Sequence, residues 1–314
     1  MAKTIFAANQ PPSFLAGWTS RLALFAAVLL AVTVVLHRLF SLPTPIALNI
    51  AAACFAGAGL ALVMGLIAGL DVWITGRQGA ARIIFGLTVA LGLLAIPAAI
   101  WSLARQWPEI NDVTTDIADP PPFVAAANSR VAGANPVAYP AERFADLQRK
   151  FYPDLKSLIV PRTPDETFGV VQQALAKLRY IVTAATSPSV EDGTPGLVET
   201  SDTTMMLGFV DDVAIRVMED EAGSSIDIRS ASRYGRNDFG RNAERTRLIL
   251  KEIVARLEAT ITRPDANKPA RLDKKKPVKR QKGRDPASTA DRRRPDPSRS
   301  DARRGQQRKE SQPE

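Results

Sequence analysis

The stretch IALNIAAACFAGAGLALVMGLIAGL, residues 46–70, decides the architecture of this chain. It runs for 25 residues without a charge, and Asn49 is its only strongly polar side chain. A helix rises about 1.5 Å per residue, so about 20 apolar residues cross the hydrocarbon core of a bilayer. A helix buried in a soluble domain rarely stays apolar on all its faces over such a length. The stretch therefore predicts a membrane-spanning helix.

Two further apolar runs lie on either side of this stretch. Residues 22–40 form the first run, and because no small-residue cleavage site follows it, we interpret it as an uncleaved span rather than a signal peptide. Residues 83–103 form the third run and contain Pro97, which membrane helices tolerate. The sequence therefore predicts a short N-terminal segment at residues 1–20 and a three-helix membrane region at residues 21–104.

Small residues recur at every fourth position of the central run. Positions four apart lie on one face of a helix, and a smooth face lets another helix approach closely. We expect this stripe to pack mainly against the chain's own spans. The alternative is contact with a second copy of the chain or with another membrane protein, besides the membrane lipids. The stripe consists of Ala53, Gly57, Ala61, Gly65 and Gly69.

The basic residues near the ends of the spans predict an orientation. Lys3, Arg21, Arg77 and Arg82 fall on the side of the N-terminus, and Arg38 and Arg105 fall on the other side. Lysine and arginine are enriched on the cytoplasmic side of membrane proteins. The bias of four to two therefore predicts a cytoplasmic N-terminus and a C-terminal domain outside the cytoplasm.

The formal net charge of +9 is concentrated in the C-terminal tail. Residues 263–314 hold 18 Lys and Arg against 8 Asp and Glu, with seven prolines and no aromatic residue. Such a segment cannot bury enough apolar surface to fold, so we predict a disordered basic tail at residues 261–314. Basic runs bind phosphates without sequence preference, which makes anionic-lipid or nucleic-acid binding an alternative function. We do not expect nucleic acid, because the predicted orientation places the tail outside the cytoplasm.

The chain has one cysteine, Cys54, and one histidine, His37. A disulfide within the chain is therefore excluded, and so is a metal site built from several Cys and His ligands. A Ser-His-Asp triad would have to use His37 at the edge of the membrane. We expect neither a metal nor a cofactor.

An acidic, proline-ended segment follows the membrane region. Residues 109–122 read EINDVTTDIADPPP, and the three consecutive prolines favour an extended polyproline geometry. We expect residues 105–122 to act as a semi-rigid linker and residues 123–260 to form a folded domain.

The pattern of the folded domain predicts an α+β fold. Thr163 followed by Pro, Asp and Glu is typical of a helix start. Strands are predicted at residues 158–160, 180–186, 197–206, 209–218 and 225–233, and a final helix at residues 239–259. In the last strand Ile226 and Ile228 are expected to face the core, whereas the alternating Asp227 and Arg229 are expected to face solvent. The order β-α-β-β-β-β-α predicts an antiparallel sheet with two helices packed on it in a two-layer domain.

Four stretches of this domain carry a resemblance to a known family. They read NDVTTDIADPPPF at residues 111–123, RVAGANPVAYP at 130–140, GFVDDVAIRV at 208–217 and IDIRSASRYGRNDFGRNAERTRLIL at 226–250. Over about residues 111–258 the chain resembles domain-of-unknown-function family 1499 (DUF 1499). Membrane-anchored bacterial members of that family also place apolar spans before this domain. The resemblance implies a bacterial inner-membrane protein, and it supplies no reaction and no catalytic residues.

A polar cluster marks the junction between the last strand and the final helix. Asp238, Asn242 and Arg245 are four and then three residues apart, so a helix stacks them on one face. We predict that Asp238 caps the helix and that Arg233 joins the others on one polar surface. As binding residues, the four would hold an anion or a small ligand at the helix N-terminus. The favoured alternative is structural, a cap and a turn without a ligand.

Three classes of function stay open at this point. The favoured class is an integral membrane protein that presents an envelope-facing binding or scaffolding domain. The second is a membrane-anchored enzyme of unknown reaction, which we favour less because no nucleophile and base stand at a recognisable spacing. Asp211 and Asp212 are adjacent in a predicted strand and face opposite sides, so they are not expected to act as a catalytic pair. The third class is binding through the basic tail.

Overall fold

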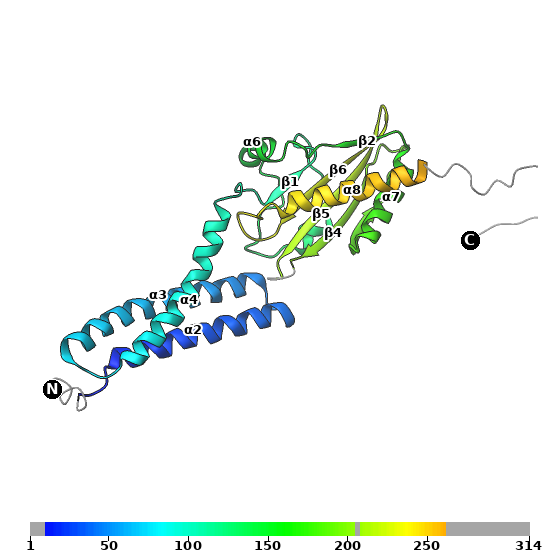
Figure 1. Ribbon diagram of the computed structural model, residues 1–314. Coiled ribbons are helices and arrows are strands. Elements are labelled where there is room, and N and C mark those ends of the chain that lie inside the picture. Colours follow the sequence, from blue (N-terminus) through cyan, green and yellow to red (C-terminus); the bar gives the residue numbers. More distant parts are fainter. Residues whose placement is uncertain (1–9, 205–207, 262–314) are drawn as a thin grey trace, which may run out of the picture. The chain divides into compact units, whose positions relative to one another are not determined.

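The computed structural model describes residues 10–204 and 208–261 of the chain. Its N-terminal part contains three long apolar helices, α2 (Phe14–Leu39), α3 (Thr44–Thr75) and α4 (Ala80–Ala104) (Figure 1). By length and composition each of them can cross a membrane, which confirms the three predicted spans. α2 begins earlier than the predicted run, and α3 ends at Thr75, five residues beyond the predicted span. The predicted tail, from residue 262 onward, lies outside the described residues.

The three helices pack through small residues of α3. Its buried residues are Ala47, Cys54, Ala58, Ala61, Gly65 and Ala68. From Cys54 onward they are spaced by four and three residues, which places them on one helical face. A Cβ atom added to Gly65 would lie 2.5 Å from the side chain of Leu87, so a larger residue there would force Leu87 to move. The predicted stripe coincides with this face at Ala61 and Gly65. Contact of the stripe with a second chain stays a prediction.

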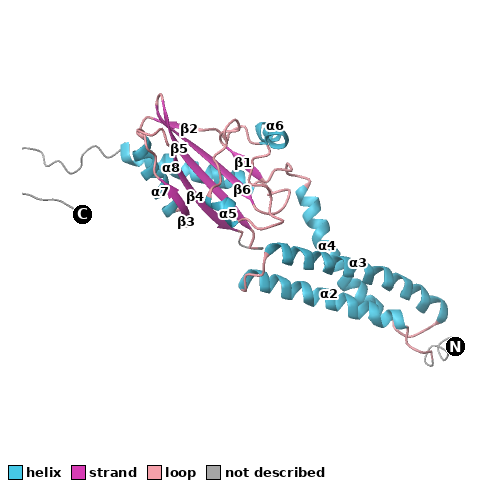
Figure 2. Cartoon of the chain, turned by 180° about the vertical axis from the view of Figure 1, so that it is seen from behind, coloured by secondary structure: helices cyan, strands magenta, loops and turns pink. Residues whose placement is uncertain are grey.

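The C-terminal part is an α+β domain with an antiparallel sheet, as predicted. Its strands are β1 (Asp112–Thr114), β2 (Leu158–Val160), β3 (Val182–Thr186), β4 (Gly196–Thr203), β5 (Val210–Asp220) and β6 (Gly223–Ser232). Among the described residues the sheet has the order β1-β6-β5-β4-β3, and β2 also pairs with β6 (Figure 2). Its helices are α5 (Ala125–Ser129), α6 (Ala141–Phe151), α7 (Pro164–Lys177) and α8 (Arg241–Ile261). β5 and β6 form a tight hairpin in which Asp220 pairs with Gly223.

One face of the sheet is apolar and is covered by α7 and α8 (Figure 1). Val213, Ile215 and Val217 alternate along β5 and meet Ile249 and Ile253 of α8 in one fully buried core. α7 begins as predicted, because the Thr163 hydroxyl accepts a hydrogen bond from the backbone N–H of Glu166 at its N-terminus. The packing of α7 and α8 on this face agrees with the two-layer arrangement that the sequence pattern predicts.

The opposite face of the sheet is polar and is also buried. Asp227 and Arg229, which were expected to face solvent, are only 1% and 3% exposed. Residues 116–139, here called the covering segment, include α5 and lie over this face. Phe123 and Ala126 of the segment pack against the small side chains of β5 and β6. The prediction of a solvent-exposed face is therefore wrong, because the chain between β1 and β2 covers it.

The expected linker is part of the domain. Ile110 and Val113 are fully buried in a second apolar cluster with α6. β1 pairs in an antiparallel manner with β6, where Asp112 lies opposite Ala231. The three consecutive prolines of this segment favour an extended geometry, and that local preference is the basis of the predicted spacer. The structure instead places residues 110–115 inside the sheet and its core.

Candidate functional site

The predicted cluster lies where β6 leads into α8, and Asp238 caps that helix. The buried Asp238 carboxylate accepts hydrogen bonds from the backbone N–H groups of Gly240 at 2.9 Å and Asn242 at 2.8 Å. The N–H groups of the first helical turn have no partner within the helix, so a carboxylate placed there satisfies them. Burial raises the pKa of Asp238, and the hydrogen bonds from Asn242 and Gly240 oppose that rise.

Asn242 and Arg245 belong to a buried network on the face covered by the helices. The Asn242 side-chain oxygen accepts hydrogen bonds from Ser230 at 2.8 Å and from Arg245 at 2.6 Å. The Nη2 atom of Arg245 also donates to Asp211 at 2.7 Å and to Asp202 at 2.8 Å. The guanidinium group is therefore neutralised by two carboxylates, and the network joins α8 to β4, β5 and β6.

Arg233 lies on the opposite face of the sheet. Its Nε and Nη2 atoms donate to Oδ1 of Asp212 at 3.0 and 2.7 Å. Successive residues of a strand face opposite sides, so Asp211 holds Arg245 on one face while Asp212 holds Arg233 on the other. The predicted convergence of the four residues on one surface is therefore wrong. Asp238, Asn242 and Arg245 come together, and Arg233 does not join them.

Arg216 is the centre of the buried polar face and ties the covering segment to the sheet. It is 4% exposed and donates to Asp116 at 3.2 Å and to Asp119 at 2.6 Å, both from the covering segment. It also donates to Asp227 of the neighbouring strand at 3.2 Å. A buried charge is stable only when it is paired, so these three carboxylates fix both Arg216 and the segment above it.

Two further side chains on the same face, Arg229 and Glu199, bind the segments next to the sheet. Arg229 donates from Nε and Nη2 to the two carboxylate oxygens of Asp112 at 3.0 and 2.7 Å, which is a bidentate pair. Glu199, 2% exposed on β4, accepts hydrogen bonds of 2.8 to 2.9 Å from the backbone N–H groups of residues 124–126. Glu199 therefore caps the start of α5 from the sheet.

Sequence reasoning missed this network, although one signal pointed to it. Arg216 and Arg229 occupy alternate positions in strands whose other positions form the core. Charged residues at such positions require buried partners, and the acidic residues 112–119 could supply them. Chemically the arrangement pairs charges and holds the chain together, and it leaves the carboxylates engaged with arginines and backbone N–H groups.

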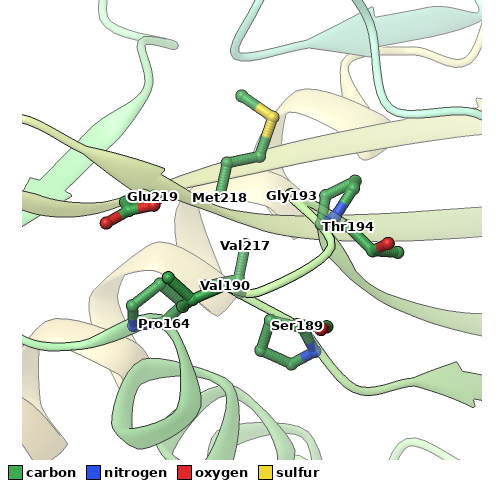
Figure 3. A pocket seen from close by; sticks show the side chains of 10 residues that line it. Pro164, Ser189, Val190, Gly193, Thr194, Val217, Met218 and Glu219 are labelled. Carbon is green, nitrogen blue, oxygen red and sulfur yellow. The ribbon is translucent and has the colours of Figure 1, made fainter.

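A shallow pocket lies near the other end of the sheet. It has a volume of about 240 Å³ and is lined by the β3–β4 loop, the start of α7 and the end of β5 (Figure 3). Val190 and Thr194 of the loop contribute to the lining, together with Pro164 of α7 and Met218 of β5. Glu219 is the only ionisable residue in its lining. The pocket thus lacks the pair of titratable groups that acid–base chemistry would use.

These features define a class of protein: an α+β domain with a buried arginine–aspartate network, joined to three helices able to span a membrane. Residues 112–253 match the family model described as "Protein of unknown function (DUF1499)", and the chain resembles that family over this range. The matched range begins at β1, which agrees with the inclusion of this strand in the domain. Comparison with curated proteins and with solved structures finds no match. The function is therefore argued from the geometry.

Proposed function

We propose that this chain is an integral protein of a bacterial inner membrane that presents a binding or scaffolding domain on the periplasmic side. The observation that carries the proposal is the short connection between the two parts. α4 ends at Ala104 and β1 begins at Asp112. An extended chain spans at most 3.3–3.6 Å per residue, so these two residues lie within about 28 Å of each other. The domain is therefore held at the membrane surface, where it can retain a ligand or a partner.

The buried charges favour binding over catalysis. A catalytic acid or base needs a titratable group that is free to exchange a proton with a substrate. In the described part of the chain, aspartates form ion pairs with each of Arg216, Arg229 and Arg245. Such pairs specify a structure and are unsuited to proton transfer. An enzymatic function is thus the less favoured alternative.

The basic residues at the helix ends support the orientation. The backbone N–H of Ser13 donates to the carbonyl oxygen of Gln78 at 2.8 Å, so the start of α2 and the α3–α4 connection lie at the same end of the helices. Arg77 and Arg82 belong to this end, and the count from the sequence alone assigns Lys3 and Arg21 to the same side of the membrane. The opposite end has Arg38 and Arg105. The bias of four to two supports a cytoplasmic N-terminus.

Cysteine accessibility tests this proposal cleanly because the chain has a single native cysteine. Cys54 is replaced by Ala, and one new cysteine is introduced as Ala222→Cys, in the exposed β5–β6 turn, or as Thr75→Cys, at the exposed end of α3. We expect a membrane-impermeant maleimide to label the first variant in intact spheroplasts and the second only after permeabilisation. The reverse pattern would place the domain in the cytoplasm and overturn the proposed orientation.

A further inference from the structure

Three of the stretches that carry the family resemblance meet at one groove on the domain surface. The groove has a volume of about 440 Å³. One wall comes from residues 117–123, the proline-rich stretch, and the other from residues 137–141. Arg229 of β6 lies between them, and it is the only charged residue in the lining. Neither the ion pairs nor the apolar core described above require an open cleft at this place.

Buried and exposed residues separate the floor of the groove from its rim. Arg229 and Phe123 are buried and form the floor, whereas Ala118 and Ala138 are exposed and stand at the rim. The guanidinium carbon of Arg229 lies 4.5 Å from the centre of the Phe123 ring and 5.7 Å from that of Tyr139. The cation is therefore flanked by two aromatic rings, and the remaining lining is aliphatic or proline.

The positive charge of Arg229, on the floor of the groove, is already paired with a carboxylate. Arg229 makes its bidentate pair with Asp112 and donates to the carbonyl oxygens of Pro121 at 3.3 Å and Val137 at 2.7 Å. These contacts use four of the five guanidinium N–H groups, and one N–H of Nη1 is left. An anion would meet the Asp112 carboxylate beside the arginine, so the floor favours an uncharged ligand with one hydrogen-bond acceptor.

From this geometry we propose that the groove binds the acyl ester of a membrane lipid, with the acyl chain between the two walls and the ester carbonyl at Arg229. The apolar lining fits an acyl chain, and the single spare N–H fits one carbonyl oxygen. Asp112, which contacts Arg229, lies within about 28 Å of the end of α4 by chain length alone, so the bilayer is the nearest source of such a molecule. The inference rests on the proposed binding role and names its ligand class.

Photolabelling tests this inference on the full chain in lipid nanodiscs. The probe is a phosphatidylcholine with a diazirine on one acyl chain, and labelled peptides are mapped by mass spectrometry. We expect labelling of residues 117–141 in addition to the membrane helices. Ala118→Trp or Ala138→Trp fills the groove and should abolish the label there, while the matched variant Ala185→Trp, at an exposed site on β3, should retain it.

Three outcomes would overturn the inference: no label in the groove, label that persists in both filled variants, or stronger groove labelling by a diazirine fatty acid than by the ester. Labelling of α2–α4 in every sample is the internal control. Competition with excess unlabelled methyl stearate tests the wild-type groove without any substitution, and it should remove the groove label. The cysteine assay can fail without affecting this result, and an empty groove leaves the membrane orientation unchanged.

Discussion

Asp211 and Asp212 are neighbours in the chain, yet they hold arginines on opposite faces of the same sheet. Arg245 reaches Asp211 from α8, and Arg233 reaches Asp212 from the end of β6. Helical spacing correctly grouped Asn242 with Arg245, because both belong to α8. It could not place Arg233, whose direction is set by strand alternation. The partners of Arg245 precede it by 34 and 43 residues, which no local pattern reveals.

The cap at Asp238 predicts a contrast between two substitutions. Asp238→Ala removes the acceptor for the N–H groups of Gly240 and Asn242 and should cost about 0.5–2 kcal/mol of stability. Asp238→Asn keeps an acceptor and should cost little. Chemical denaturation of the full chain in detergent measures both, and equal losses for the two variants would argue against a cap.

The same residue predicts the sign of a pH dependence. Burial raises the folded-state pKa of Asp238, so the folded protein binds this proton more readily than the unfolded chain. The resulting stabilisation is complete below the ordinary aspartate pKa and is lost as the pH rises through the raised value. Asp238→Asn, which does not ionise, should therefore gain stability relative to the wild type over the pH range that begins at the ordinary aspartate pKa and rises from there. A constant difference across this range would contradict the prediction.

Two glycines beside the cap differ in the space around them. Gly235 and Gly240 both have positive φ angles, +91° and +76°, which cost an L-residue about 1–2 kcal/mol. A Cβ atom at Gly240 would also lie 2.5 Å from the Trp107 ring, whereas at Gly235 nothing lies closer than 3.8 Å. Gly240→Ala should therefore be the more destabilising by about 1–3 kcal/mol, as measured by thermal unfolding. Equal effects would show that Trp107 gives way freely.

At the scale of elements, the covering segment is held by polar contacts rather than by a large apolar core. Ala214 and Ala231 offer it only small side chains, so Arg216 and Glu199 supply the fixed points. The strands, α7 and α8 could be predicted because their apolar residues repeat at local periods. The burial of the acidic segment could not, because Asp112, Asp116 and Asp119 are paired with arginines 97 to 117 residues away in the chain.

Removal of the Glu199 carboxylate should loosen the covering segment selectively. Glu199→Ala deprives the N–H groups of residues 124–126 of their acceptor, at an expected cost of about 1–3 kcal/mol. Hydrogen exchange of α5 should accelerate while exchange of α8 stays slow. The matched control is Glu191→Ala, at an exposed position of the β3–β4 loop, which should leave both rates unchanged. Acceleration throughout the domain would mean that Glu199 supports the whole sheet.

At the scale of the whole molecule, the composition of the tail predicts that it adds nothing to folding. Residues 263–314 lie outside the described residues, and their sequence offers no apolar core. Truncation before Arg263 should therefore leave the melting temperature of the full membrane protein unchanged. A drop of several degrees would show that the tail docks on the rest of the chain.

The boundary of the folded domain gives the last prediction. A fragment of residues 123–261 corresponds to the domain that the sequence analysis predicts after the linker. It lacks β1, and with it the fully buried side chains of Ile110 and Val113. It also lacks Asp112, the carboxylate partner of Arg229. Loss of one member of a buried ion pair costs about 3–5 kcal/mol, and a domain is stable by only about 5–15 kcal/mol. The missing strand and its core add to that loss, so this fragment should not fold.

A fragment of residues 108–261 should fold, because it keeps β1, the buried apolar residues and every acidic partner of the polar face. Circular dichroism and dispersion of amide proton resonances compare the two fragments under the same conditions. We expect cooperative unfolding and dispersed resonances only for the longer one. If the shorter fragment unfolded cooperatively at the same temperature, residues 108–122 would be a linker, and the ion pairs that Asp112, Asp116 and Asp119 make with the sheet would contribute nothing to the fold. If neither folded, the domain would depend on the membrane helices, to which Asn237 is already connected by a hydrogen bond to the carbonyl oxygen of Ala104 at 3.2 Å.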